Sequence, residues 1–203
     1  MNNKLYAGGG KDGGRLIISS VECFDPSTGQ WSAAADMNLA RCNHGVAVVN
    51  GKLYAVGGED DTSTAISSVE CFDPSTGQWS AVADMNLARY DHGMVAVDGK
   101  LYAVGGEDEE DDTDTLSSVE CFDPSMGQWS AVADMSTARK DHGVAAVNGK
   151  LYAIGGYADA GTFIKSVECF DPSTGQWTAG VPMDDDSCDF AVVAMECPMD
   201  FGS

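Results

Sequence analysis

Short apolar runs separated by pairs of turn residues form the main pattern of this chain. Residues 44–49 and 52–56 are two such runs, and Asn50-Gly51 lies between them. An Asn-Gly pair in this setting predicts a β-hairpin, because both turn residues must adopt positive φ. Equivalent pairs recur further along the chain at Asp98-Gly99 and Asn148-Gly149. The pattern therefore predicts repeated antiparallel hairpins, and no segment of useful length has helical periodicity.

Each hairpin is followed by two further strand-like segments. A Gly-Gly pair ends the second strand, a polar loop of variable length follows, and the segment Ser-Val-Glu-Cys-Phe predicts a third strand. An Asp-Pro turn leads to a fourth strand that starts near a tryptophan. The block occurs four times, and its tryptophans are spaced by 48, 50 and 48 residues, at Trp31, Trp79, Trp129 and Trp177. Such a period indicates one supersecondary unit copied in tandem, each copy burying its apolar face on the next.

Four antiparallel strands per copy, repeated around an axis, predict the blades of a β-propeller. Each copy carries Leu-Tyr-Ala-Val-Gly-Gly or a close variant, then Ser-Val-Glu-Cys-Phe-Asp-Pro, Gly-Gln-Trp, a methionine, and Ala-Arg-x-x-His-Gly in most copies. This order of motifs resembles the Kelch repeat, and most strongly the propeller domain of BTB-Kelch adaptor proteins. The resemblance covers nearly the whole chain. We therefore expect one all-β domain over residues 1–203, a β-propeller of four Kelch repeats.

The two ends of the chain are in matching phase. The N-terminus starts at the turn between the first and second strands, and residues 189–196 align with the first strand that this copy lacks. We therefore expect a composite blade to close the ring and remove its open sheet edges. The expected blades cover residues 1–37 plus 187–197, 38–85, 86–135 and 136–183. A closed ring predicts a monomer. The alternative is an open arc completed by a second chain, because members of the resembled family more often carry six blades.

The net charge narrows the classes of partner. The chain has 32 Asp and Glu against 11 Lys and Arg, a formal net charge of −21. Such a surface repels phosphate backbones and anionic membranes, so we expect neither nucleic acid nor membrane as a partner. No apolar run is long enough to span a bilayer, and no secretory signal is expected.

The cysteines indicate a reducing compartment. Four of the seven occupy the same position in the four copies, at Cys23, Cys71, Cys121 and Cys169. A disulfide framework does not place one cysteine on each of four separated strands, so we expect small buried free thiols and a cytoplasmic protein. The unrepeated Cys42, Cys188 and Cys197 are expected to be the reactive ones.

Two features suggest metal chemistry. His44, His92 and His142 begin the first strand of their blades, and three imidazoles around an axis are compatible with zinc. Side chains of radial blades point at neighbouring blades, however, so we expect structural histidines hydrogen-bonded between blades. The acidic loop at residues 107–114 has no glycine at the place where a calcium loop turns sharply, so it predicts a solvated charge run. No metal or cofactor is expected.

The arginines Arg41, Arg89 and Arg139 occur once per blade, with Ser187 in the fourth copy. They either form ion pairs at the surface or between blades, or they bind a partner. In the resembled adaptors, the loops that join strands two to three and four to one form a face that grips a peptide segment of a target. Carried over to this sequence, that face comprises Arg41, Asn43, Arg89, Asp91, Arg139 and Asp141, with the acidic loop residues Glu59, Asp60, Asp61, Glu107, Asp108 and Glu109.

The resemblance therefore implies a protein-protein interaction module, which could serve as the substrate-recognition part of a larger adaptor. The dense carboxylates predict a protein target with a basic or mixed-charge segment, steered to this face by charge. One alternative is a structural or self-assembling repeat protein without a selected ligand surface. A Kelch-type metalloenzyme has less support, because the metal ligands of such enzymes have no recognisable counterpart here. No nucleophile elbow or phosphate-binding glycine loop occurs, so we expect no enzymatic activity.

Overall fold

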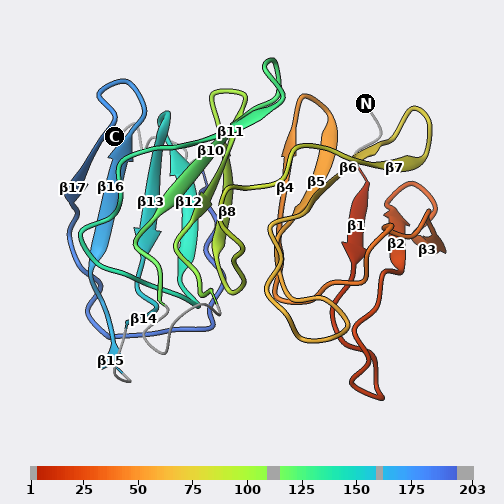
Figure 1. Ribbon diagram of the computed structural model, residues 1–203, viewed down its shortest axis with the longest axis horizontal. Helices are drawn as coiled ribbons and strands as arrows, with labels where there is room; N and C mark the ends of the chain where they lie inside the picture. Colours follow the sequence, from red (N-terminus) through yellow and green to blue (C-terminus); the bar gives the residue numbers. More distant parts are fainter. Residues whose placement is uncertain (1–3, 109–114, 159–161, 196–203) are drawn as a thin grey trace, which may run out of the picture.

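The computed structural model describes residues 4–108, 115–158 and 162–195. These residues form one three-stranded and three four-stranded antiparallel sheets, with one short additional hairpin (Figure 1). The described residues contain no helix, and hence no helix that is long and apolar enough to cross a membrane. The all-β architecture of four-stranded blades that the sequence predicts is confirmed.

The strands follow one another in the same order in every blade, from the axis outward. The first blade contains β1 (Leu5–Gly8), β2 (Val21–Asp25) and β3 (Gln30–Ala33). The second contains β4 (Gly45–Val49), β5 (Lys52–Val56), β6 (Val69–Asp73) and β7 (Gln78–Ala81). The third contains β8 (Gly93–Val97), β9 (Lys100–Val104), β10 (Val119–Asp123) and β11 (Gln128–Ala131). The fourth contains β12 (Gly143–Val147), β13 (Lys150–Ile154), β16 (Val167–Asp171) and β17 (Gln176–Ala179).

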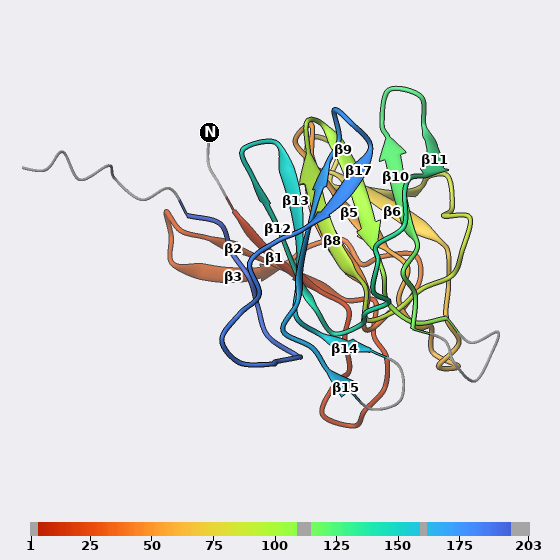
Figure 2. The same cartoon turned by 90° about the vertical axis from the view of Figure 1, so that its left-hand side faces the viewer.

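The Asn-Gly turns behave as the sequence predicts. Asn50 and Gly51 have φ values of 51° and 74°, which is the conformation that a two-residue hairpin requires. The turn sets the register in which Val49 faces Lys52. The loops between the second and third strands lie at the opposite end of the blades from these turns (Figure 1). In the fourth blade this loop carries the small hairpin of β14 (Tyr157–Ala158) and β15 (Thr162–Phe163), which projects at that end (Figure 2).

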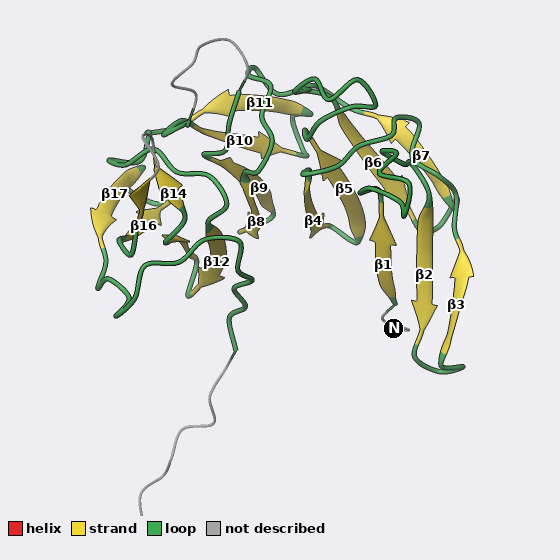
Figure 3. Ribbon diagram, turned by 90° about the horizontal axis from the view of Figure 1, so that it is seen from below, coloured by secondary structure: helices red, strands yellow, loops and turns green. Residues whose placement is uncertain are grey.

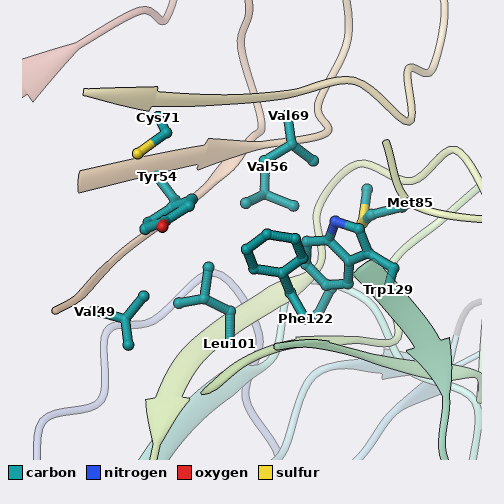
Figure 4. Packing of buried hydrophobic residues seen from close by; sticks show 10 residues of the cluster. Val49, Tyr54, Val56, Val69, Cys71, Met85, Leu101, Phe122 and Trp129 are labelled. Atoms are coloured by element: carbon teal, nitrogen blue, oxygen red, sulfur yellow. The ribbon is translucent and has the colours of Figure 1, made fainter. Parts of the chain in front are cut away.

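Apolar side chains fill the interfaces between neighbouring blades (Figure 4). Tyr54 of the second blade meets Phe122 of the third, with ring centroids 5.8 Å apart. Phe122 packs on Trp129 of its own blade at 5.2 Å. The indole of Trp129 donates a 3.0 Å hydrogen bond to the carbonyl of Ala83, where the preceding blade ends. Each blade therefore buries its aromatic side chains only through contact with a neighbour.

The Gly-Gly pairs of the second and third blades lie where a segment that links two blades passes very close to their backbone. A Cβ atom would not fit there. A Cβ atom on Gly57 would lie 2.6 Å from the carbonyl oxygen of Arg89. A Cβ atom on Gly106 would lie 2.6 Å from the carbonyl oxygen of Tyr90. Both glycines also have positive φ, so no other residue type fits either position without strain.

The four sheets form an open arc and not a closed ring (Figure 3). Within the described residues β1 pairs with β2 alone, and residues 189–195 form no strand. The expected composite blade is therefore not formed by the described residues, which form an open arc, and the expected completion of such an arc by a second chain stays a prediction. The N-terminal and C-terminal blades lie at opposite ends of the arc (Figure 3).

The C-terminal segment nevertheless takes the place beside the fourth blade that the sequence alignment assigns to it. The Asp189 amide donates a 3.0 Å hydrogen bond to the Asp141 carbonyl, just as the Asp141 amide does to Asp91. Val192 packs over Gly143, where a Cβ would collide with it. The segment follows the path of a first strand, but β1 is at the other end of the arc and does not pair with it.

The cysteines of the described residues are free thiols. The four repeated ones are buried between blades, as expected. Cys42 is buried as well, which argues against its expected reactivity, and its backbone pairs with Glu59 of the next loop. Cys188 is half-buried, and Cys197 lies outside the described residues.

Candidate partner-binding face

The three repeated arginines are fully buried, with 0% of their surface exposed. Arg41 donates hydrogen bonds to the carbonyl oxygens of Gly57 at 2.8 Å and Ser68 at 3.0 Å, and it forms a 3.0 Å ion pair with Glu70. Arg89 and Arg139 repeat this arrangement with Glu120 at 3.1 Å and Glu168 at 2.8 Å. The expectation that Arg41, Arg89 and Arg139 contact a partner is therefore wrong, because each one holds the chain entering a blade to that blade.

The glutamate of each pair organises the whole incoming linker. Glu70 accepts hydrogen bonds from the backbone amides of Asn38 at 2.7 Å and Leu39 at 3.0 Å, in addition to its bond with Arg41. Burial alone would raise the pKa of Glu168, but the hydrogen bonds from Ser136 and Arg139 lower it below its ordinary value. These carboxylates are buried ions held by several donors. The sequence signal for them is a glutamate that recurs at one strand position in step with the recurring arginine.

A row of turn residues crosses the arc at the end where the loops lie. Asn43, Asp91, Asp141 and Asp189 each have positive φ, between 49° and 53°. The Asp91 amide donates to the Asn43 carbonyl at 3.1 Å, and the row continues through Asp141 to Asp189 with bonds of 3.0 Å. These four turn residues line an open depression of about 210 Å³, together with His44, His92, His142 and Phe190. Three of its four turn positions are aspartates, so the depression is acidic.

Burial and the repulsion from nearby carboxylates make Asp91 and Asp141 weaker acids in the folded protein. Burial and, after it, the nearby charges of Asp141 and Glu59 raise the pKa of Asp91 to about 7, while Lys140 opposes them. The pKa of Asp141 is raised by burial and by Asp189. Near neutral pH, Asp91 is therefore divided between its charged and neutral forms, and a cation at the depression would favour the charged form.

Acidic residues of the neighbouring loops contact this row of turn residues, and together they form one surface. Asn43 donates a 2.6 Å hydrogen bond to Glu59, and Lys140 forms an ion pair and hydrogen bond with Glu107. The pKa of Tyr90 is raised by burial and by Glu107, which lies against it. We call the surface made by Asn43, Glu59, Asp91, Glu107 and Asp141 the loop face. Sequence reasoning places these five residues on one face, and the structure brings them together.

The remaining predicted loop residues have different positions. Asp60 turns back on its own loop, where it accepts hydrogen bonds from the amides of Thr62 at 2.8 Å and Thr64 at 3.1 Å. Asp61 is exposed beside it. Asp108 is the last described residue before the gap in the third loop, and Glu109 lies outside the described residues.

The repeated histidines lie between blades, as expected, but most of their ring nitrogens lack the expected hydrogen bonds among the described residues. Both ring nitrogens of His142 and the Nδ1 atom of His44 are buried without a hydrogen-bond partner among the described residues. Burial lowers the pKa of His142 to about 3 and that of His44 to about 4, so both are neutral at neutral pH. Their rings pack against glycines of the neighbouring strands, and no group of metal-ligating residues is found in the described part of the chain.

Comparisons with known proteins agree with this arrangement. A family model described as the KLHDC2/KLHL20/DRC7 Kelch-repeats domain matches residues 1–194. A solved structure of YjhT, a Kelch-type propeller, superposes with a TM-score of 0.75 at 20% sequence identity. That superposition covers 92% of this chain but only 65% of YjhT, and it shows the fold alone. No curated protein matches the sequence.

Proposed function

Since this chain belongs to the Kelch-repeat family, whose domains generally act as non-enzymatic protein-interaction propellers, we propose that it binds a segment of a partner protein across the loop face. The observation that carries the proposal is the continuity of this face. The row from Asn43 to Asp189 is hydrogen-bonded from blade to blade, and Glu59 and Glu107 are attached to it. A rigid backbone row with carboxylates along it is a preorganised surface, which reduces the entropy lost on binding.

The partner segment is basic or of mixed charge. Lys140, a cation that lies against the loop face, is already paired with Glu107, whereas Glu59, Asp91 and Asp141 add further carboxylates. A lysine or arginine of the partner would favour the charged form of Asp91, which burial and the repulsion from Asp141 and Glu59 disfavour. The chain's net charge of −21 steers such a segment toward the protein, and salt weakens this effect.

The three repeated arginines are not part of this binding surface, because they are buried in their own blades. The wider roles predicted from the sequence, as a recognition part of a larger adaptor in the cytoplasm, remain proposals. The buried free thiols are compatible with a reducing compartment.

A selection of displayed random peptides on the immobilised full chain tests this function. We expect enrichment of lysine and arginine, and weaker binding of the selected peptides at about 200 mM than at about 50 mM salt. Asp91→Asn should weaken binding by about two- to fivefold, the range expected for one partly exposed ion pair. Asparagine fits this backbone position, since Asn43 occupies the equivalent one with φ of 53°.

Asp98→Asn is the matched control, because it removes the same charge at the opposite end of the blade. Asn50 and Asn148 show that asparagine fits this turn as well. Equal effects of the two substitutions, or peptides with no charge preference, would contradict binding at the loop face.

A further inference from the structure

The first blade repeats the arginine-binding pocket of the other three blades. In the second blade, Arg41 is held by the carbonyl oxygen of Gly57, by Ser68 and by the carboxylate of Glu70. The equivalent residues in the first blade are Gly9, Ser20 and Glu22. The Gly9 amide donates to the Ser20 carbonyl at 3.0 Å, as Gly57 does to Ser68 at 3.1 Å. The φ values of Gly9 and Gly57, 69° and 60°, also agree, so the backbone of the pocket is preformed.

In the first blade this pocket is open. Glu22 is exposed, and its carboxylate has no hydrogen bond or ion pair within the described part of the chain. A Cβ on Gly10 would meet nothing within 4 Å, whereas one on Gly106 would lie 2.6 Å from the carbonyl oxygen of Tyr90 in the segment that enters the third blade. The edge of β1 that faces away from β2 is likewise unpaired among the described residues.

The apolar side chains around the pocket are uncovered too. Trp31 is 51% exposed, whereas Trp129 at the same position of the third blade is 8% exposed. Leu5 is 60% exposed, and its counterpart Leu101 is 0% exposed. In the third blade, the preceding blade covers these positions. The first blade therefore presents a charged pocket, a strand edge and an apolar patch side by side on one surface.

The three arginines of the linkers between blades are not free to enter the pocket. Arg41, Arg89 and Arg139 are buried in their own pockets, in this chain and in any second copy of it. The fourth arginine, Arg15, lies in the turn of the first blade's own loop, where its amide donates to the Asp12 carbonyl at 2.9 Å.

The C-terminal linker is also a poor match. It has Asp184-Asp185-Asp186-Ser187 where the linker into the second blade has Asn38-Leu39-Ala40-Arg41. Docked on the first blade, the C-terminal linker would place three carboxylates near Glu22 and leave its charge unpaired. Like charges at such a distance are destabilising, so neither self-closure nor a head-to-tail second copy satisfies the pocket.

We propose that the first blade binds an extended segment of a partner protein with the pattern Asn-x-Ala-Arg or Ser-x-Ala-Arg, followed after three residues by an apolar strand. The arginine donates to the Gly9 carbonyl, to Ser20 and to the Glu22 carboxylate, and the two amides at the start of the pattern donate to Glu22. The strand pairs with the free edge of β1, and its apolar side chains cover Leu5 and Trp31. Strand addition to an exposed edge is a general mode of peptide recognition. This surface is separate from the loop face, so either proposal stands without the other.

A labelled peptide tests the proposal directly. Its sequence is that of residues 86–98, with Asp91→Asn and Asp98→Asn to reduce repulsion from the acidic chain. Fluorescence anisotropy with the full chain should show saturable binding at one site. Exchange of the peptide arginine for glutamine, or Glu22→Gln in the chain, should each weaken binding at least about tenfold, and the two effects should not add.

Two control variants show whether the peptide binds at this pocket. Asp185→Asn removes the same charge from the opposite end of the arc and should leave binding unchanged. Glu22 is exposed, so Glu22→Gln should also leave the melting temperature unchanged, and a loss of binding then reports on the pocket. Binding that ignores Glu22→Gln would indicate exchange with the chain's own residues 86–98 and would overturn the proposal. A concentration-dependent dimer that excludes the peptide would assign the surface to a second copy and overturn it as well.

Discussion

The first and third blades contain the same strand sequence in different surroundings. Val-Glu-Cys-Phe-Asp forms β2 in the first blade and β10 in the third. Glu120 is buried and holds a linker, whereas the equivalent Glu22 is exposed. In a repeat protein, stability is approximately the sum of each unit and its interfaces with neighbours. The comparison shows that burial of a residue in this fold depends on the preceding blade, and not on the residue's own strand.

Substitution of the equivalent glutamates should give the largest difference in the free energy of unfolding between the two blades. Glu120→Ala leaves the buried Arg89 without its ion pair and should lower the free energy of unfolding by about 3–5 kcal/mol. Glu22→Ala should change it by less than about 0.5 kcal/mol, as is usual for exposed residues. Urea unfolding followed by tryptophan fluorescence measures both. Equal losses would show that Glu22 is engaged in solution and would remove the contrast.

The leucines should show a smaller difference of the same kind. Leu101→Ala leaves a cavity between the second and third blades and should cost about 2–5 kcal/mol. Leu5→Ala removes a side chain that is mostly exposed already, so we expect a cost below about 1 kcal/mol. Thermal unfolding of the two variants under the same conditions provides the measurement, and a larger cost at Leu5 would contradict an open first blade.

Asp91 permits a comparison between blades at the loop face, because the second blade has Asn43 at the same position. The folded-state pKa of Asp91 is about 7, above its ordinary value of 3.8, so folding disfavours the charged form. The resulting destabilisation is absent below pH 3.8 and grows as the pH rises to 7. Asp91→Asn should therefore stabilise the protein by roughly 1–2 kcal/mol at about pH 8, after allowance for solvent screening, and by nothing near about pH 3.5.

The test is how the stabilisation by Asp91→Asn depends on pH. The buried histidines also destabilise the protein as the pH falls below 6.5, but they do so in both variants and cancel in the difference. A gain from Asp91→Asn that is the same at both pH values would show that the charged form of Asp91 is not its cause.

The smallest effect concerns thiol reactivity. Among the described cysteines, Cys188 is half-buried in the C-terminal segment, whereas Cys42 and the repeated cysteines are buried. We expect a maleimide to label Cys188 before the others in the native protein, because access limits the reaction. Mass spectrometry after brief labelling identifies the modified residues, and early labelling of Cys71 or Cys121 would show that the blade interface opens readily.

Much of the fold follows from local sequence signals. The turn at Asn50-Gly51 needs positive φ at both residues, and the period of the tryptophans marks the blades. The arginines are harder to place, because their role depends on a partner distant in sequence. Arg41 and Glu70 are 29 residues apart, and only the folded blade brings them to 3.0 Å. The matching recurrence of the two residues is a usable signal for the pair.

The alignment of the two ends predicts ring closure, and it is correct for the path of residues 189–192. The chemistry of the linker opposes closure, however. Ser187 stands at the arginine position, and three aspartates precede it. An alignment of strand positions does not report whether the arginine that pairs with the blade's glutamate is present. In this linker it is absent.

Hydrogen exchange of the backbone amides tests most directly whether the first blade is open. Peptides that cover β1 and β9 are compared by mass spectrometry in the full chain at neutral pH. Because β1 is paired on one edge and β9 on both, we expect exchange at least about tenfold faster in β1. Equal protection of β1 and β9, together with protection of residues 189–195, would show a closed ring in solution and contradict the open arc.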